Sequence, residues 1–364
     1  MSDILLSDNA AIAELAQRLS LAPHIALDTE FLRERTYRPQ LCLLQVAIPG
    51  EAALVDPIAA PSLAALGTVL TNAAIPKILH AARQDLEVLW PVFGSIDPVF
   101  DTQVAAALTG MPAQIGYSEL VRRLLGIELN KAETRTDWSR RPLTPAQLRY
   151  AVDDVRHLAA LRDLLVKRLR ALGRLDWLDE ELRDLANPAR LFVDPETAVD
   201  RLRWIGELDP DRARLAQRLA AWRERRAAER DRPRSWILDD SGLRAMVLRP
   251  PRSANDLAAM VTATELPAGF VEHSGPEMLR IVDEAQLPAR LPPPAPRARP
   301  DPENLARVKR LGAVLQQKAA DLEITPEILG TRRELESLAR GNQEVDMLRG
   351  WRRAVLGEAL LAAV

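Results

Sequence analysis

The chain has 364 residues, of which 47% are hydrophobic and 27% charged, and its formal net charge is −2. These are ordinary values for a folded globular protein, and the length predicts two or three domains. The near-neutral charge gives no overall attraction to nucleic acid. The single cysteine, Cys42, excludes cysteine-rich zinc modules, and its apolar neighbours predict a buried, small hydrophobic residue.

The first twenty residues, MSDILLSDNAAIAELAQRLS, contain neither a basic start before an apolar core nor an uninterrupted apolar run. They therefore lack the pattern of an export signal or a membrane span. We expect a cytoplasmic protein with no membrane association.

Short apolar runs and helical periods alternate along the first 110 residues. This order predicts an α/β domain in which a sheet is flanked by helices. We expect strands over 24–32, 40–48, 52–57 and 77–81, and helices over 61–70 and 82–93.

The pattern turns helical at about residue 144 and stays so to the end. Thr144, followed by Pro145 and Gln147, fits an N-cap with a capping box, and we expect one long helix from there to about 171. Beyond residue 200 we expect two all-helical blocks that resemble each other faintly. The segment 287–302 between them holds seven prolines and is expected to be a stiff linker.

Acidic residues occur on one predicted strand at alternating positions. Alternation places Asp28 and Glu30 on the same face. An edge strand with a solvated acidic side is one explanation. The other is a site for Mg²⁺ or Mn²⁺, because a hard divalent cation offsets the repulsion between neighbouring carboxylates.

Two adjacent aspartates lie in the helix RYAVDDVRHL, residues 149–158. At roughly 100° per residue, Asp154 borders the apolar packing face, whereas Asp153 points outward. Tyr150 precedes Asp154 by four residues, so the two side chains can converge on one flank. A further acid, Asp85, opens a predicted helix, where favourable interaction with the helix dipole is the simpler explanation.

Longer strings carry a resemblance to a known family. DTEFLRERTYRPQLCLLQ, HAARQDLEVL and GYSELVRRLLGIELNKAETRTDWSRRPLTPAQLRYAVDDVRHL, together with the closing helical repeats, resemble the ribonuclease D family of 3'-to-5' exoribonucleases, in the tyrosine subclass of the DEDD group. The resemblance places the catalytic and metal-binding positions on Asp28, Glu30, Asp85 and Asp154, with Tyr150 as a further catalytic residue.

Asp101 is the main competitor for the middle acid. It precedes Thr102 and an apolar helical run, and this position is typical of an N-cap.

The resemblance implies an RNase H-like α/β nuclease domain, with a mixed sheet flanked by helices, followed by two all-α domains of the HRDC type. The expected boundaries are 1–175 for the nuclease, 200–286 for the first HRDC-type domain, 287–302 for the linker and 303–364 for the second.

The resemblance also implies an activity. Family members trim the 3' ends of tRNA precursors and other small structured RNAs, so RNA is the expected partner, and no obligatory protein partner is evident. Two-metal hydrolysis, with Mg²⁺ or Mn²⁺ held by the four carboxylates, would release 5'-mononucleotides.

Two segments are candidates for RNA contacts. Residues 201–252 hold 14 Arg against 8 Asp and Glu, and residues 132–142 contain Arg135, Arg141 and Trp138. Phosphate binding and base stacking would use these side chains. The alternatives are surface solubility for the arginines and core packing for Trp138.

Two other functions stay open at this point. A DNA-directed 3'-to-5' exonuclease would carry the same acids, and a non-catalytic RNA-binding protein would carry the same arginines. The chain has no phosphate-binding loop of the G-x-x-x-x-G-K-[ST] kind, so it contains no recognisable helicase motor.

Overall fold

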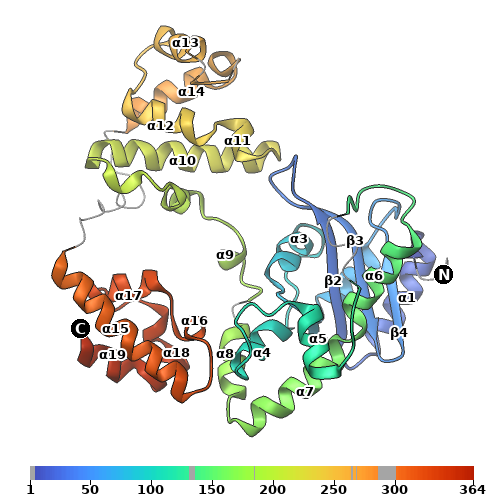
Figure 1. The fold of residues 1–364 in the computed structure, drawn as a ribbon. Helices are drawn as coiled ribbons and strands as arrows, with labels where there is room; N and C mark the ends of the chain where they lie inside the picture. The colour runs from blue at the N-terminus through green and yellow to red at the C-terminus, as the bar shows by residue number, and fades with distance from the viewer. Residues whose placement is uncertain (1–4, 131–135, 184, 264, 268, 286–300) are drawn as a thin grey trace. The chain divides into compact units, whose positions relative to one another are not determined.

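The computed structural model describes residues 5–130, 136–183, 185–263, 265–267, 269–285 and 301–364. One mixed six-stranded sheet has the order β1-β4-β3-β2-β5-β6 (Figure 1). Strand β3 is antiparallel to β2 and β4, whereas β2, β5 and β6 run parallel and β1 is parallel to β4. The strands are β1 Leu5–Leu6, β2 Ile25–Leu32, β3 Gln40–Ile48, β4 Glu51–Val55, β5 Lys77–Leu79 and β6 Val99–Asp101.

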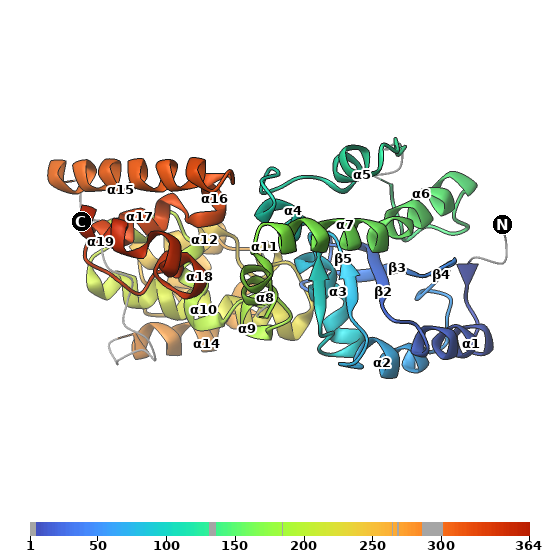
Figure 2. The ribbon, with the colours of Figure 1, turned by 90° about the horizontal axis from the view of Figure 1, so that it is seen from below.

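Helices cover both faces of this sheet. Figure 2 shows α1 and α2 on one side and α5, α6 and α7 on the other. The helices are α1 Asn9–Ser20, α2 Ala64–Leu70, α3 Arg83–Phe93, α4 Thr102–Leu108, α5 Tyr117–Leu125, α6 Pro145–Arg156 and α7 Leu158–Ala171. The expected mixed sheet flanked by helices is therefore confirmed. Its burial on two faces explains the nearly continuous apolar run of β3, in which Cys42 is fully buried.

The expected long helix from 144 to 171 is wrong in one respect. Its start is confirmed, because Thr144 Oγ1 accepts a hydrogen bond from the Gln147 N–H at 3.2 Å and Gln147 Oε1 accepts one from the Thr144 N–H at 2.8 Å. The helix is interrupted at His157, whose φ of −102° and ψ of −4° lie outside the regular helical range. Two helices, α6 and α7, therefore stand in place of one.

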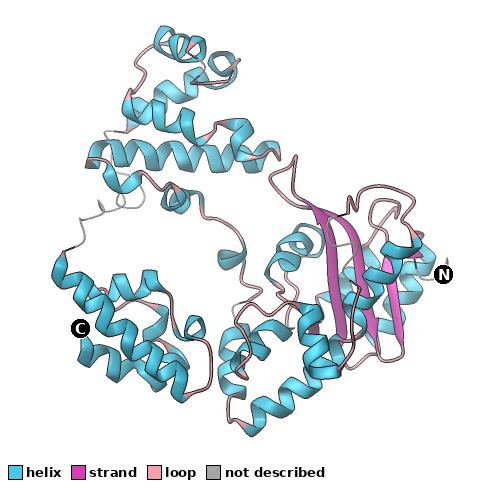
Figure 3. Cartoon of the chain, viewed as in Figure 1, coloured by secondary structure: helices cyan, strands magenta, loops and turns pink. Residues whose placement is uncertain are grey.

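The rest of the described chain is helical (Figure 3). Its helices are α8 Leu175–Arg183, α9 Pro188–Leu191, α10 Pro210–Arg230, α11 Arg234–Ile237, α12 Asp240–Leu248, α13 Ala254–Thr262, α14 Phe270–Glu284, α15 Pro302–Asp321, α16 Pro326–Leu329, α17 Arg332–Ala339, α18 Gly350–Arg352 and α19 Glu358–Ala363. Short 3-10 or π-helical turns are Pro195–Arg201, Ile205–Glu207, Asp346–Leu348 and Arg353–Gly357. Nowhere in the described ranges is a helix both long and apolar enough to cross a membrane.

The chain divides into two compact units. The first contains Met1–Leu32, Gln40–Leu191 and Pro300–Val364, so the C-terminal helices belong with the nuclease sheet. Trp177 of α8 stacks on Trp351 with ring centroids 4.4 Å apart, and Glu181 pairs with Arg352 at 2.5 Å. One hydrophobic core joins the two parts. Most of the proline-rich segment 287–302 lies outside the described residues.

The second unit contains Arg33–Pro39 and Phe192–Arg299. Its core is formed by α10 and α12 to α14, with Trp222 packed edge-on against Phe270 at 6.2 Å. The connection between β2 and β3 joins this unit, because Tyr37 donates a hydrogen bond to Glu224 at 2.5 Å. Glu224 is also held by Arg234.

Candidate active site

Asp28 and Glu30 lie on β2, the strand that α3 contacts and that α6 also contacts (Figure 1). Both side chains are half-buried. Asp28 stands opposite Gln45 of β3, and the register of the pair shifts directly after Glu30. Both carboxylates therefore lie on the same strand, two residues apart as the predicted alternation has them, and just before an irregularity in its pairing with β3.

Asp85 lies in the first turn of α3 and is only 7% exposed. Thr29, between the two acids of β2, donates a hydrogen bond from Oγ1 to Asp85 Oδ1 at 2.5 Å. This contact joins the first turn of α3 directly to the acidic strand. Asp85 is therefore a buried member of the acidic group, and the helix dipole alone does not explain its position.

Asp101 fixes the turn that leads into α3. Its side chain accepts hydrogen bonds from the N–H groups of Ala81 at 3.0 Å and Ala82 at 2.8 Å. It also caps α4 by accepting from Gln103 N–H at 2.7 Å. The expected N-cap is confirmed, and the backbone contacts at Ala81, which has a φ of +56°, add a second structural role.

Asp154 enters from α6, on the helical layer opposite α1 and α2. Tyr150 hydrogen-bonds the Asp154 carboxylate, in agreement with the predicted convergence of the two side chains. Asp153 instead pairs with Arg156 at 3.2 Å across one turn of the helix. The two neighbouring aspartates therefore differ in environment.

The four carboxylates interact electrostatically. Burial, and then the charges of Asp85, Asp154 and Glu30, raise the pKa of Asp28 well above its usual range. Burial and the charges of Asp154 and Asp85 raise the pKa of Glu30 to about 8. Burial also raises the pKa of Asp85 to about 7, against the hydrogen bond from Thr29. The pKa of Asp154 rises to about 7, through burial and then Asp153.

The donor set fits a hard divalent cation in its chemistry. Asp28, Glu30, Asp85 and Asp154 supply only oxygen ligands, and an added positive charge would offset both the cost of burying their charged forms and the repulsion at Asp28 and Glu30. Among the described residues, no three His, Cys, Asp or Glu side chains already stand close enough together to hold an ion.

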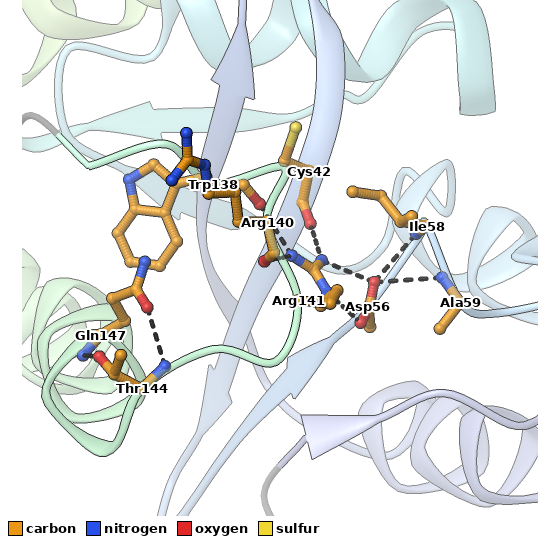
Figure 4. Close-up of polar contacts among 9 residues, drawn as sticks. All are labelled: Cys42, Asp56, Ile58, Ala59, Trp138, Arg140, Arg141, Thr144 and Gln147. Carbon is orange, nitrogen blue, oxygen red and sulfur yellow. Dashed lines mark hydrogen bonds and ion pairs between the residues drawn. The ribbon is translucent and has the colours of Figure 1, made fainter.

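Arg141 has a structural role, which contradicts the predicted RNA contact. Its guanidinium donates to both Asp56 oxygens, at 2.5 and 2.7 Å, and its remaining N–H groups donate to the carbonyls of Trp138, Arg140 and Cys42 (Figure 4). All five N–H donors of an arginine are then occupied. Burial would raise the pKa of Asp56, but the Arg141 hydrogen bonds and those from Ala59 and Ile58 outweigh it and lower the pKa.

Trp138 is buried, with 2% of its surface exposed, and packs beside Tyr150 with ring centroids 6.1 Å apart. It belongs to a core cluster between the sheet and α6. The predicted base stacking is therefore wrong, and the packing alternative is correct. Arg135, the third predicted contact, lies outside the described residues.

Comparison with known proteins agrees with this architecture. Residues 4–170 match the 3'-5' exonuclease family and residues 212–282 match the HRDC domain. A curated ribonuclease D from Zymomonas mobilis is 38% identical over 99% of this chain and 93% of its own length. The chain belongs to the ribonuclease D family. A ribonuclease D from Pseudomonas paraeruginosa is 37% identical over 99% of this chain and 96% of its own length.

A solved structure gives the same result for the fold. The chain is similar to Escherichia coli RNase D, described as an exoribonuclease involved in structured RNA processing, with a TM-score of 0.86 and 31% identity. The match covers 99% of this chain and 97% of that one. As a member of the ribonuclease D family, the protein is a 3'-to-5' exoribonuclease.

Two residues around the site, Thr29 and Tyr117, were not found by sequence reasoning. Thr29 holds Asp85, and Tyr117 lies close enough to Asp154 and Asp28 for their charges to raise its pKa, after the larger effect of burial. The position of Thr29 between Asp28 and Glu30 could have indicated from the sequence that it lies near the acidic group. Tyr117 carries no local signal, because its partners lie about 40 residues away along the chain.

Proposed function

We propose that Asp28, Glu30, Asp85 and Asp154 hold two divalent metal ions, Mg²⁺ or Mn²⁺, and that the enzyme trims the 3' ends of tRNA precursors and other small structured RNAs. The observation that carries this proposal is a group of buried carboxylates from three different elements: burial raises the pKa of all four, and the charges of Asp85 and Asp154 raise those of Asp28 and Glu30 further. Structural ion pairs lower carboxyl pKa values, whereas a group of unpaired acids is typical of a cation site.

Bound divalent ions would supply a deprotonated water and stabilise charge on the phosphate and the leaving oxygen. The side chains of this chain would prepare for that chemistry. Tyr150 would align the attacking water through its hydroxyl, which already lies in hydrogen-bond contact with Asp154. Thr29 would hold one oxygen of Asp85 and leave the other free to bind. The products would be 5'-mononucleotides.

The acidic strand also offers polar atoms to a hydrated ion. The Gln45 amide, directly opposite Asp28, is fully buried, and neither its oxygen nor its nitrogen has a hydrogen-bond partner among the described residues. Directly opposed residues of an antiparallel pair point to the same face. A water carried with the ion would satisfy this amide.

The first helical block offers a candidate RNA contact in place of Trp138. Trp236 of α11 is 56% exposed, and the Arg232 guanidinium lies 5.8 Å from the centre of its ring. An exposed aromatic ring beside an arginine can stack on an unpaired base while the cation binds a phosphate. We propose that this pair contacts the RNA.

The experiment is a digest of 3'-extended tRNA and of a DNA strand of equal length, each with Mn²⁺ or with EDTA. We expect stepwise release of 5'-mononucleotides from the RNA, only in the presence of Mn²⁺. Faster hydrolysis of the DNA strand would show that DNA, and not RNA, is the substrate. If neither strand is hydrolysed in the presence of Mn²⁺, the result would support an RNA-binding protein without nuclease activity. A Tyr150→Phe variant with full activity would remove the role of Tyr150.

A further inference from the structure

The junction between α6 and α7 has an unusual hydrogen-bond pattern. In a continuous helix, the carbonyl of Asp153 would accept from the N–H of His157, four residues later. Here the hydroxyl of Tyr117 lies between them: it donates to the Asp153 carbonyl at 2.9 Å and accepts from the His157 N–H at 3.3 Å. A side chain inserted into the helical ladder in this way bends or breaks a helix.

The position of Tyr117 is itself fixed. It is the first residue of α5, and its ring meets the His80 imidazole edge-on with centroids 5.7 Å apart. His80 is held in turn by contacts of 2.9 Å to Thr102 Oγ1 and to the Ile115 carbonyl. Because His80 precedes Asp85 by five residues, Tyr117 is packed against the segment that carries Asp85.

The Tyr117 hydroxyl binds the backbone on both sides of Asp154, one member of the acidic group. Asp154 lies between the two residues whose backbone groups Tyr117 binds, and its charge acts on the Tyr117 hydroxyl. The ψ of −4° at His157 differs by roughly 40° from that of a regular helix, so the break changes the course of the chain three residues after Asp154, which lies in the last turn of α6.

We propose that Tyr117 is a positioning residue for Asp154: its hydroxyl holds the α6–α7 junction open and so aims the Asp154 carboxylate at Asp28 and Glu30. This inference rests on the proposed metal site. Without the hydroxyl, the Asp153 carbonyl and the His157 N–H become each other's partners. The two helices then merge, and Asp154 turns away from the other acids.

The test compares Tyr117→Phe with Tyr37→Phe in the full-length protein. Each change removes one partly buried, hydrogen-bonded hydroxyl, but that of Tyr37 binds Glu224 in the second unit. Mn²⁺ binding is measured by electron paramagnetic resonance without RNA. We expect the dissociation constant for Mn²⁺ to rise about tenfold in Tyr117→Phe, as for other residues that orient metal ligands, and to stay unchanged in Tyr37→Phe. Wild-type Mn²⁺ affinity in Tyr117→Phe would overturn the proposal.

A crystal structure of Tyr117→Phe gives a readout that needs no metal. We expect helical backbone angles at His157 and a displaced Asp154 side chain. An unchanged junction would also overturn the proposal. If the wild-type protein binds no Mn²⁺ while the variant closes the junction, the proposed metal site fails and the effect of Tyr117 on Asp154 stands.

Discussion

The buried carboxyl of Asp85 makes the metal-free enzyme sensitive to pH. In an unfolded chain such a group has a pKa near 4. In the folded protein, burial raises the pKa of Asp85 to about 7. Between these values the folded protein holds a proton that the unfolded chain has released, so stability falls as pH rises through this window.

The magnitude follows from the width of the window. Between pH 5 and pH 8 the proton difference persists over roughly two pH units, from pH 5 to the folded pKa of about 7. Each unit is worth about 1.4 kcal/mol, so the free energy of unfolding decreases by at most about 3 kcal/mol. Asp85→Asn removes this loss, because the amide does not ionise and keeps an oxygen that can accept from Thr29. We expect the variant to be more stable than the wild type in EDTA, with a gain that grows from pH 5 to pH 8.

The assay is thermal unfolding in EDTA at both pH values, repeated with Mn²⁺. Mn²⁺ should stabilise the wild type and leave Asp85→Asn unchanged, because the variant lacks a ligand. Asp153→Asn is the matched control, since its carboxylate pairs with Arg156 and lies outside the proposed ligand set. It should keep the wild-type stabilisation by Mn²⁺ and gain less stability in EDTA than Asp85→Asn. A gain that does not depend on pH, or a variant less stable than the wild type at pH 8, would refute the reasoning.

Further predictions concern Arg141, the RNA contact and pH. Arg141→Met should destabilise the protein to urea by about 3 kcal/mol, because it leaves buried Asp56 without its cation, and an unchanged midpoint would contradict this. Trp236→Ala should weaken RNA binding about tenfold in a filter assay, whereas wild-type affinity would remove the proposed stacking. The Mn²⁺ concentration that gives half-maximal activity should decrease as the pH is raised from about 6.5 to about 8.5, because the carboxyl ligands must lose their protons to bind the ion. An increase over this pH range would contradict the assignment of these acids as metal ligands.

Local patterns in the sequence were sufficient for much of the fold. Alternation in β2 placed Asp28 and Glu30 on one face, and helix phase separated Asp154 from Asp153. The capping box at Thr144 predicted the start of α6. The two-residue strand β1 and the three-residue strand β6 were missed, because runs this short carry no measurable period.

Other features depend on contacts between distant segments. No proline or glycine marks the break at His157, and the hydroxyl that binds the His157 N–H belongs to Tyr117, 40 residues earlier in the chain. The burial of Trp138 and the saturation of Arg141 also need partners from β3 and β4 and from the turn at Asp56. An arginine in a basic segment looks the same in sequence whether it binds phosphate or a buried aspartate.

The central claim is that Asp154, and not its neighbour Asp153, completes a metal-dependent exonuclease site. The most direct measurement is the rate of 5'-mononucleotide release from 3'-extended tRNA, with saturating Mn²⁺, by the wild type, Asp154→Asn and Asp153→Asn. We expect Asp154→Asn to lose nearly all activity and Asp153→Asn to keep most of it. Equal losses in the two variants, or an active Asp154→Asn protein, would contradict the account.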